Sequence, residues 1–211
     1  MRSHMKKPVL IVLILALTAS PSLFAQEESP APVAPQNVTV AHALGDQAFS
    51  FSLGGFLPLF FYRVDDGVVE GTNLFIGARG ALQYLTYLSS VWVFSVELNG
   101  ALAFTPNFNI YWTLPILAKI SYVVDLGQFE LFLTMGLGVN FQSFIGYSRM
   151  DFMGRPEVTF YIPIDPTLDF GISAAYWFVP QFASKEQEET KSGQTRLGNF
   201  LDVSISLIYH F

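Results

Sequence analysis

The chain has 211 residues, of which 51% are hydrophobic and 13% are charged, with a formal net charge of −6 and no cysteine. Soluble proteins carry about 25% charged residues, so this composition is unusually apolar for a soluble domain. The lack of cysteine excludes disulfides and thiolate chemistry. An acidic chain without basic clusters also argues against a nucleic-acid partner.

Residues 1–25 have the parts of a secretory signal peptide. Lys6 and Lys7 form a positive segment, residues 9–17 form an apolar segment, and Ala25 offers a small residue before the cleavage point. The apolar run is too short for a transmembrane helix. The first four residues resemble a cloning scar, with a native start further upstream as the alternative. We therefore predict a cleaved leader and an exported chain.

Residues 26–45 follow the leader and are rich in proline and polar side chains. Such a composition predicts an extended periplasmic lead-in rather than a folded domain. His42 lies in this segment without a ligand-type partner nearby in the sequence, so we interpret it as an exposed histidine rather than a metal ligand.

The remaining residues, 46–211, alternate between apolar and polar positions, which is the pattern of strands whose two faces meet different surroundings. Beyond the leader, no run of about 18 apolar residues predicts a spanning helix. In a transmembrane barrel, one strand face meets lipid and the other meets the lumen. The sequence thus predicts an all-β fold, a closed antiparallel transmembrane β-barrel of about eight strands. The expected segments are 47–60, 73–85, 91–104, 109–123, 128–141, 156–164, 168–180 and 199–211.

The links between these segments alternate in length. Short links are expected at 86–90, 124–127 and 165–167, and long polar links at 61–72, 142–155 and 181–198, with a further short link at 105–108. One barrel end would then carry turns and the other end would carry surface loops. An even number of strands predicts that both termini lie at the periplasmic end.

The closing segment alternates strictly and ends on an aromatic residue, with Leu207, Tyr209 and Phe211 on one face. It is similar to the C-terminal signal of bacterial outer-membrane barrels, which implies that these three residues engage the barrel assembly machinery. From Gln47 onward the chain resembles the small OmpW, OmpX and OmpA types of barrel. The resemblance implies a location in the bacterial outer membrane, in contact with its lipid.

Several charged side chains are predicted to face the lumen. Arg79 and Glu97 are symmetric about Leu88, and Lys119 and Glu130 are similarly placed about the turn at Asp125, so two cross-strand ion pairs are expected. We favour a structural plug over an ion-conducting gate, because eight strands leave little free interior. Further inward positions by parity are Asp169, Asp202, Phe132, Trp177, Phe75, Tyr111, Leu117 and Tyr161.

Pro115 falls in the middle of a predicted strand. Proline cannot donate a hydrogen bond to the neighbouring strand and is normally found at edges or bulges. The favoured interpretation is a bulge without a transport role. The alternative is a weak lateral seam through which an apolar ligand leaves the barrel.

The sequence leaves two functions open. The resemblance to the OmpW type implies a narrow conduit for small hydrophobic solutes. The alternative is a surface-exposed structural or adhesin-type barrel that binds host ligands through loops 142–155 and 181–198. Catalysis is not expected, because His42 and His210 both lie at the periplasmic end and form no Ser–His–acid constellation. No cofactor or metal site is predicted.

Overall fold

A computed structural model describes residues 42–144, 147–182 and 195–211. The predicted signal peptide and most of the lead-in lie outside the described residues. Within them the chain forms β1 (Gln47–Arg63), β2 (Val69–Gly71), β3 (Gly77–Tyr87), β4 (Trp92–Phe104), β5 (Ile110–Asp125), β6 (Glu130–Phe144), β7 (Tyr147–Asp165), β8 (Leu168–Gln181) and β9 (Arg196–His210). The described part contains no helix long and apolar enough to cross a membrane.

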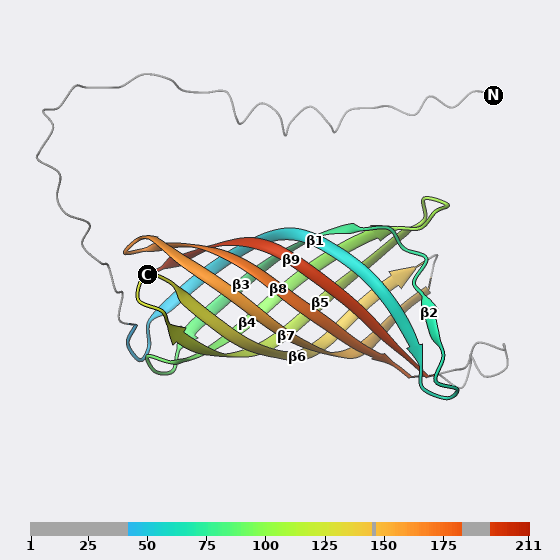
Figure 1. Cartoon of the computed structure of the whole chain (residues 1–211), viewed down its shortest axis with the longest axis horizontal. Helices are drawn as coiled ribbons and strands as arrows, with labels where there is room; N and C mark the ends of the chain where they lie inside the picture. Colours follow the sequence, from blue (N-terminus) through green and yellow to red (C-terminus); the bar gives the residue numbers. More distant parts are fainter. Residues whose placement is uncertain (1–41, 145–146, 183–194) are drawn as a thin grey trace, which may run out of the picture. The chain divides into compact units, whose positions relative to one another are not determined.

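Eight of these strands close into an antiparallel barrel (Figure 1). Strands β3 to β9 pair in chain order, and β1 pairs with both β3 and β9, which joins the two edges of the sheet. The short strand β2 lies outside this ring and pairs with the end of β1 at Phe60–Tyr62. The predicted fold class is confirmed.

The two faces of each strand have opposite chemistry, as the alternation predicted. Along β4, the side chains of Val93, Ser95 and Glu97 are buried, whereas those of Phe94 and Val96 are exposed. Strand β5 alternates in the same way over almost its whole length. Large apolar side chains thus cover the outside of the barrel. An outer surface of this kind suits hydrocarbon rather than water.

Short turns join β3 to β4, β5 to β6 and β7 to β8, and all three lie at one end of the barrel. We call this the turn end; the C-terminus lies there as well (Figure 1). The amide of Phe211 donates to the carbonyl of Gln47 at 3.1 Å. Leu207, Tyr209 and Phe211 all point outward. We call the opposite end the loop end.

The predicted long loop at 142–155 is wrong. Strands β6 and β7 pair without interruption from Glu130 opposite Tyr161 to Phe144 opposite Tyr147. Arg149, Asp151 and Arg155 therefore belong to a strand. Their charges indicated a solvated loop, but in this barrel alternate strand residues point into a polar interior.

The predicted inward position of Phe75 is also wrong. The segment expected at 73–85 begins only at Gly77, so Phe75 lies in the connection before β3 and is exposed rather than inward. Tyr111, Leu117 and Tyr161 do face the interior and are buried.

Candidate functional site

A cluster of six charged side chains fills the middle of the barrel. It consists of Arg79 on β3, Glu97 on β4, Lys119 on β5, Arg155 and Glu157 on β7, and Asp202 on β9. We call this cluster the plug. It contains three cations and three carboxylates, so its formal charges balance.

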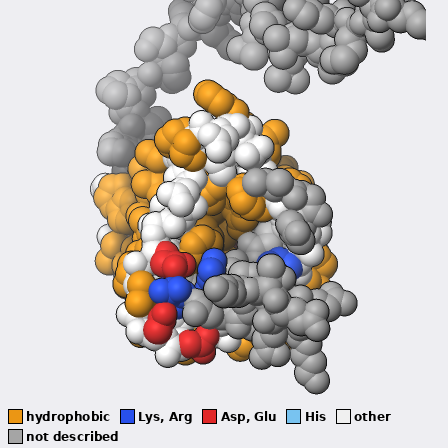
Figure 2. Space-filling model, turned by 90° about the vertical axis from the view of Figure 1, so that its right-hand side faces the viewer, with side chains coloured by type: hydrophobic (Ala, Val, Ile, Leu, Met, Phe, Trp, Pro, Cys, Tyr) orange, Lys and Arg blue, Asp and Glu red, His pale blue; other side chains and the backbone are white. Residues whose placement is uncertain are grey.

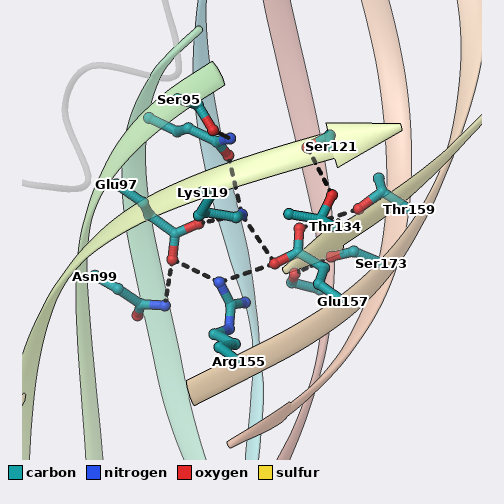
Figure 3. A network of polar contacts seen from close by, with 12 residues as sticks. Ser95, Glu97, Asn99, Lys119, Ser121, Thr134, Arg155, Glu157, Thr159 and Ser173 are labelled. Carbon is teal, nitrogen blue, oxygen red and sulfur yellow. Dashed lines mark hydrogen bonds and ion pairs between the residues drawn. The ribbon is translucent and has the colours of Figure 1, made fainter. Parts of the chain in front are cut away.

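Arg155 lies at the centre of the plug and is 0% exposed. Its Nη1 lies 2.7 Å from Oε1 of Glu97 and 2.9 Å from Oε2 of Glu157. Its Nη2 lies 2.9 Å from Oδ2 of Asp202. Figure 3 shows the Arg155 guanidinium between Glu97, on β4, and Glu157, on the same strand β7. A single side chain therefore connects β4, β7 and β9 across the lumen.

The other two cations complete the plug. Lys119 Nζ lies 2.8 Å from Glu97 and 2.9 Å from Glu157 (Figure 3). Arg79 Nη1 lies 3.0 Å from Oδ1 of Asp202, and its Nη2 lies 3.6 Å from Glu97. A buried charge is tolerated only when it is paired and its hydrogen bonds are satisfied. Each of these charges has at least two partners of opposite sign.

Neutral side chains bind the remaining polar atoms of the plug. The indole Nε1 of Trp177 donates to Asp202, and Asn99 donates to Glu97 at 2.8 Å. The guanidinium of Arg155 also lies 5.7 Å from the centre of the Trp177 ring, within cation–π range. A polar pocket beside Arg79 and Glu97 has a volume of about 10 Å³, which is room for about one water molecule. The plug closes the axis of the barrel.

The structure changes how the predicted ion pairs form. Arg79 does contact Glu97, but the two are not opposite each other, because Arg79 faces Ala101 and Glu97 faces Gln83. The predicted pair of Lys119 and Glu130 is wrong. Lys119 faces Gly136, whereas Asp125 faces Glu130, so the β5–β6 turn is centred beyond Asp125.

Sequence reasoning missed Arg155 and Glu157, because it assigned the first to a loop and began the strand at residue 156. Arg155 and Glu157 are two residues apart, and Asp151 lies four residues before Arg155; these even spacings were the available signal, since such residues point to the same face of a strand. The other predicted inward residues Phe132, Asp169, Trp177 and Asp202 are all buried.

An open cavity of about 740 Å³ occupies the loop end above the plug. We call it the vestibule. Figure 2 looks onto this end and shows a hollow with hydrophobic inner walls and charged side chains on part of its rim. Its lining includes apolar and aromatic side chains and also polar ones: Phe61, Leu74, Tyr111 and Phe144 in the first group, and Glu70, Gln142, Arg149 and Arg196 in the second. Buried aromatic and apolar side chains, among them Phe56, Met153, Trp177 and Phe200, form one cluster with Tyr111 beneath it.

The turn end is closed by a second cluster, which includes Leu85, Tyr87 and Phe132, and by His42 from the lead-in. The His42 ring stacks 4.0 Å from the Tyr87 ring and 5.0 Å from the His210 ring. Its Nε2 lies 3.5 Å from Glu130, and the Nε2 of His210 lies 2.7 Å from Asp169. The expectation of an exposed His42 is therefore wrong.

The reason is that the end of the lead-in folds back onto β3. The amide of Gly45 donates to the carbonyl of Tyr87, and the amide of Tyr87 donates to the carbonyl of Asp46, both at 2.9 Å. These bonds hold His42 against the mouth of the barrel. In the part of the chain that the structure describes, no three His, Asp or Glu side chains are arranged to hold a metal ion.

Replacing His42 by alanine should lower the free energy of unfolding by about 1 kcal/mol, because the variant loses two ring contacts of a buried side chain. Urea unfolding in lipid vesicles measures this change. Leu44→Ala is the control, since Leu44 is 77% exposed in the same segment. Equal stability of the two variants would show that His42 does not hold this end closed.

The ladder between β4 and β5 is interrupted at Pro115. Pairing stops at Asn99 and Gly100, opposite Pro115 and Leu114, and the register is the same on both sides of the gap. The favoured interpretation of a bulge is therefore wrong at this position; bulges occur near Pro58 and Pro163 instead. The missing proline N–H accounts for the gap.

The interruption lies at the height of the vestibule floor. Pro115 pairs with Asn140 on β6, and Asn140 pairs with Asp151 on β7. Asp151 in turn accepts hydrogen bonds from Gln142 and Arg149, both of which line the vestibule. A similar gap between β7 and β8 occurs at Pro156, between the flanking plug residues Arg155 and Glu157.

Comparisons with known proteins agree with this architecture. A protein-family model that carries no functional description matches residues 26–209. Among curated proteins, no sequence matches the chain. The solved structures that it resembles include the Neisserial surface protein A, with a TM-score of 0.59 and 11% identity over 81% of this chain and 99% of that one.

Two further solved structures are similar at lower scores. The outer membrane protein OprG from Pseudomonas aeruginosa has a TM-score of 0.49 and 12% identity over 81% of this chain and 98% of that one. Ail, the attachment invasion locus protein of Yersinia pestis, has a TM-score of 0.43 and 12% identity over 79% of this chain and 99% of that one. The chain belongs to the family whose model spans residues 26–209, and it folds as a small eight-stranded antiparallel β-barrel.

Proposed function

We propose that the barrel takes small, mainly apolar solutes into the vestibule from the loop end and releases them sideways at the Pro115 interruption. The proposal takes the barrel to lie in the bacterial outer membrane with its turn end and both termini on the periplasmic side. It also takes the outward side chains of Leu207, Tyr209 and Phe211 to be the signal for the assembly machinery.

The observation that carries the proposal is the vestibule itself. Its volume of about 740 Å³ lies within the range of about 300–1,000 Å³ that small-molecule sites usually have. Phe61, Leu74, Tyr111 and Phe144 provide an apolar wall, while a few polar groups such as Gln142 lie among them. A concave, mostly apolar wall with few polar groups is what small apolar solutes require.

A sideways route follows from the closed axis. A solute that moved straight down would meet the plug, where Arg155 contacts Glu97, Glu157 and Asp202. Breaking these pairs would leave charges buried without partners, which is strongly unfavourable. The Pro115 interruption lies beside the vestibule floor and lacks strand pairing on one side, so it offers a shorter path to the lipid.

Uptake of a small uncharged apolar probe into liposomes containing the refolded barrel tests this function. We expect wild-type uptake well above that of empty liposomes, with no steady ion conductance in planar bilayers. Pro115→Ala restores a backbone N–H to the β4–β5 seam, so uptake should fall several-fold while assembly is unchanged. Pro156→Ala is the matched control, because its gap lies at the height of the plug, and uptake should stay at the wild-type rate.

Two results would contradict the proposal in different ways. Equal uptake by the wild type and Pro115→Ala would contradict release at Pro115, while the entry of apolar solutes into the vestibule would still stand. Uptake at the background of empty liposomes in every variant would instead favour the surface-exposed, adhesin-type barrel, and protease removal of the loops on intact cells would then be the next measurement.

A further inference from the structure

Arg196 stands out among the charged groups of the vestibule, because its guanidinium has no close acceptor among the residues that the structure describes. Its Nε is buried and makes no hydrogen bond. Its Nη2 lies 3.9 Å from Oε2 of Glu70, which is near the limit of an ion pair. Glu70 is itself closer to Arg63, whose Nε lies 3.4 Å from Oε1 of Glu70. A buried donor without an acceptor is unfavourable, so an acceptor that arrives from outside would be stabilised here.

Arg149, on the same vestibule wall, shows what a satisfied guanidinium looks like. Its Nε lies 2.7 Å from one carboxylate oxygen of Asp151, and its Nη2 lies 2.6 Å from the other. This is the two-pronged contact by which arginine prefers to bind a carboxylate. Arg149 is therefore occupied by a residue of the protein, whereas among the described residues the Arg196 guanidinium has only the 3.9 Å contact with Glu70.

An apolar surface leads inward from Arg196. Its register partner on β1 is Arg63, and Phe61 lies two residues further along that strand. The Phe61 ring lies 6.0 Å from the Phe200 ring, which lies 6.4 Å from the Tyr111 ring. Phe61 and Tyr111 line the vestibule, and Phe200 lies beneath them. A row of aromatic rings thus runs from the region of the open guanidinium to the floor.

We propose that the vestibule selects amphiphiles that carry a single carboxylate head. The head binds the guanidinium of Arg196, and the apolar body lies against Phe61 and Tyr111, which line the vestibule. This inference rests on the proposed uptake of solutes into the vestibule and specifies their class. The ligand carboxylate takes the place of the long contact with Glu70, and Glu70 competes with it for the same guanidinium.

Binding of 4-phenylbutyrate and of 4-phenylbutanol tests the inference, since the two probes share an apolar body and differ in the head. Both are titrated calorimetrically into nanodiscs that contain the full barrel, and the signal of empty nanodiscs is subtracted. We expect the wild type to bind the carboxylate about tenfold more tightly than the alcohol, because hydrogen bonds to charged groups are the stronger ones.

Three variants separate charge, geometry and competition. Arg196→Gln should weaken carboxylate binding about tenfold and leave alcohol binding unchanged, which also shows that the variant is folded. Arg196→Lys should give an intermediate loss, because it keeps the charge but not the paired donors. Glu70→Gln should tighten carboxylate binding a few-fold. The matched control is Glu130→Gln at the turn end, which should leave both affinities unchanged.

The outcomes distinguish this inference from the function on which it rests. If both probes bind with equal affinity and Arg196→Gln changes neither affinity, the proposed carboxylate site at Arg196 is contradicted, while binding of apolar solutes in the vestibule still stands. If neither probe binds to any variant, solute uptake into the vestibule fails together with it.

Discussion

Replacing Arg155 by methionine is expected to lower the free energy of unfolding by about 3–5 kcal/mol, the range typical for removing one partner of a buried ion pair. Arg155 contacts Glu97, Glu157 and Asp202 and is fully buried. Without it, three carboxylates share only Lys119 and Arg79 in the buried interior of the barrel. Urea unfolding in lipid vesicles, followed by tryptophan fluorescence, measures the loss.

Two further variants make this test specific. Asp66→Asn removes an exposed carboxylate that pairs with Arg63, and because exposed pairs contribute little, its loss should stay within about 1 kcal/mol. Adding Asp202→Asn to Arg155→Met should restore part of the stability, because one unpaired carboxylate is removed. A loss below 1 kcal/mol for Arg155→Met alone would mean that water enters the plug and solvates the carboxylates.

Replacing Gly138 by alanine is expected to lower the free energy of unfolding by about 1–3 kcal/mol, as insertion of a methyl group into a packed interior does. A Cβ on Gly138 would overlap the carbonyl oxygen of Ile116 and would lie 2.9 Å from the Cα of Leu117. Both are backbone atoms of β5. They can move only if the β5–β6 pairing around Leu117 is disturbed. Urea unfolding in vesicles again gives the value.

Gly100→Ala is the matched control for this variant. Gly100 also lies in a strand, but the nearest side-chain atom to its added Cβ would be 3.8 Å away, on Leu114. Its stability should be unchanged or slightly higher, because glycine weakens a strand interior. If the two alanine variants had equal stability, the close approach of β5 and β6 at Gly138 would not be needed by the fold.

The strands could be predicted because their signal is local. In residues 91–104, Phe94 and Val96 alternate with Ser95 and Glu97, and the structure places the first pair outward and the second pair inward. The final strand was found in the same way. Alternation does not distinguish a strand from a loop where the residues are mostly polar. For this reason the first part of β7, which begins at Tyr147, was predicted to be a loop.

The plug could be predicted only in part. The alternation of residues along each strand correctly predicted that the side chains of Arg79, Glu97 and Lys119 face inward. The sequence analysis also assumed that inward-facing charges pair across the nearest turn. The register is instead set by the number of residues in each turn, and the β5–β6 turn was placed too early. Glu97 also contacts Arg155 at 2.7 Å, although Arg155 lies 58 residues away in the chain.

The sequence by itself determined the closed β-barrel, the side of each strand that faces outward, and the aromatic C-terminal strand, because all three depend on a period of two residues along the chain. Only the tertiary structure decided which charges meet, that His42 closes the turn end, and that Arg196 has only a long contact with Glu70 among the described residues. These features depend on closure of β1 onto β9 and on contacts across the lumen, where strands far apart in the sequence come within hydrogen-bonding distance.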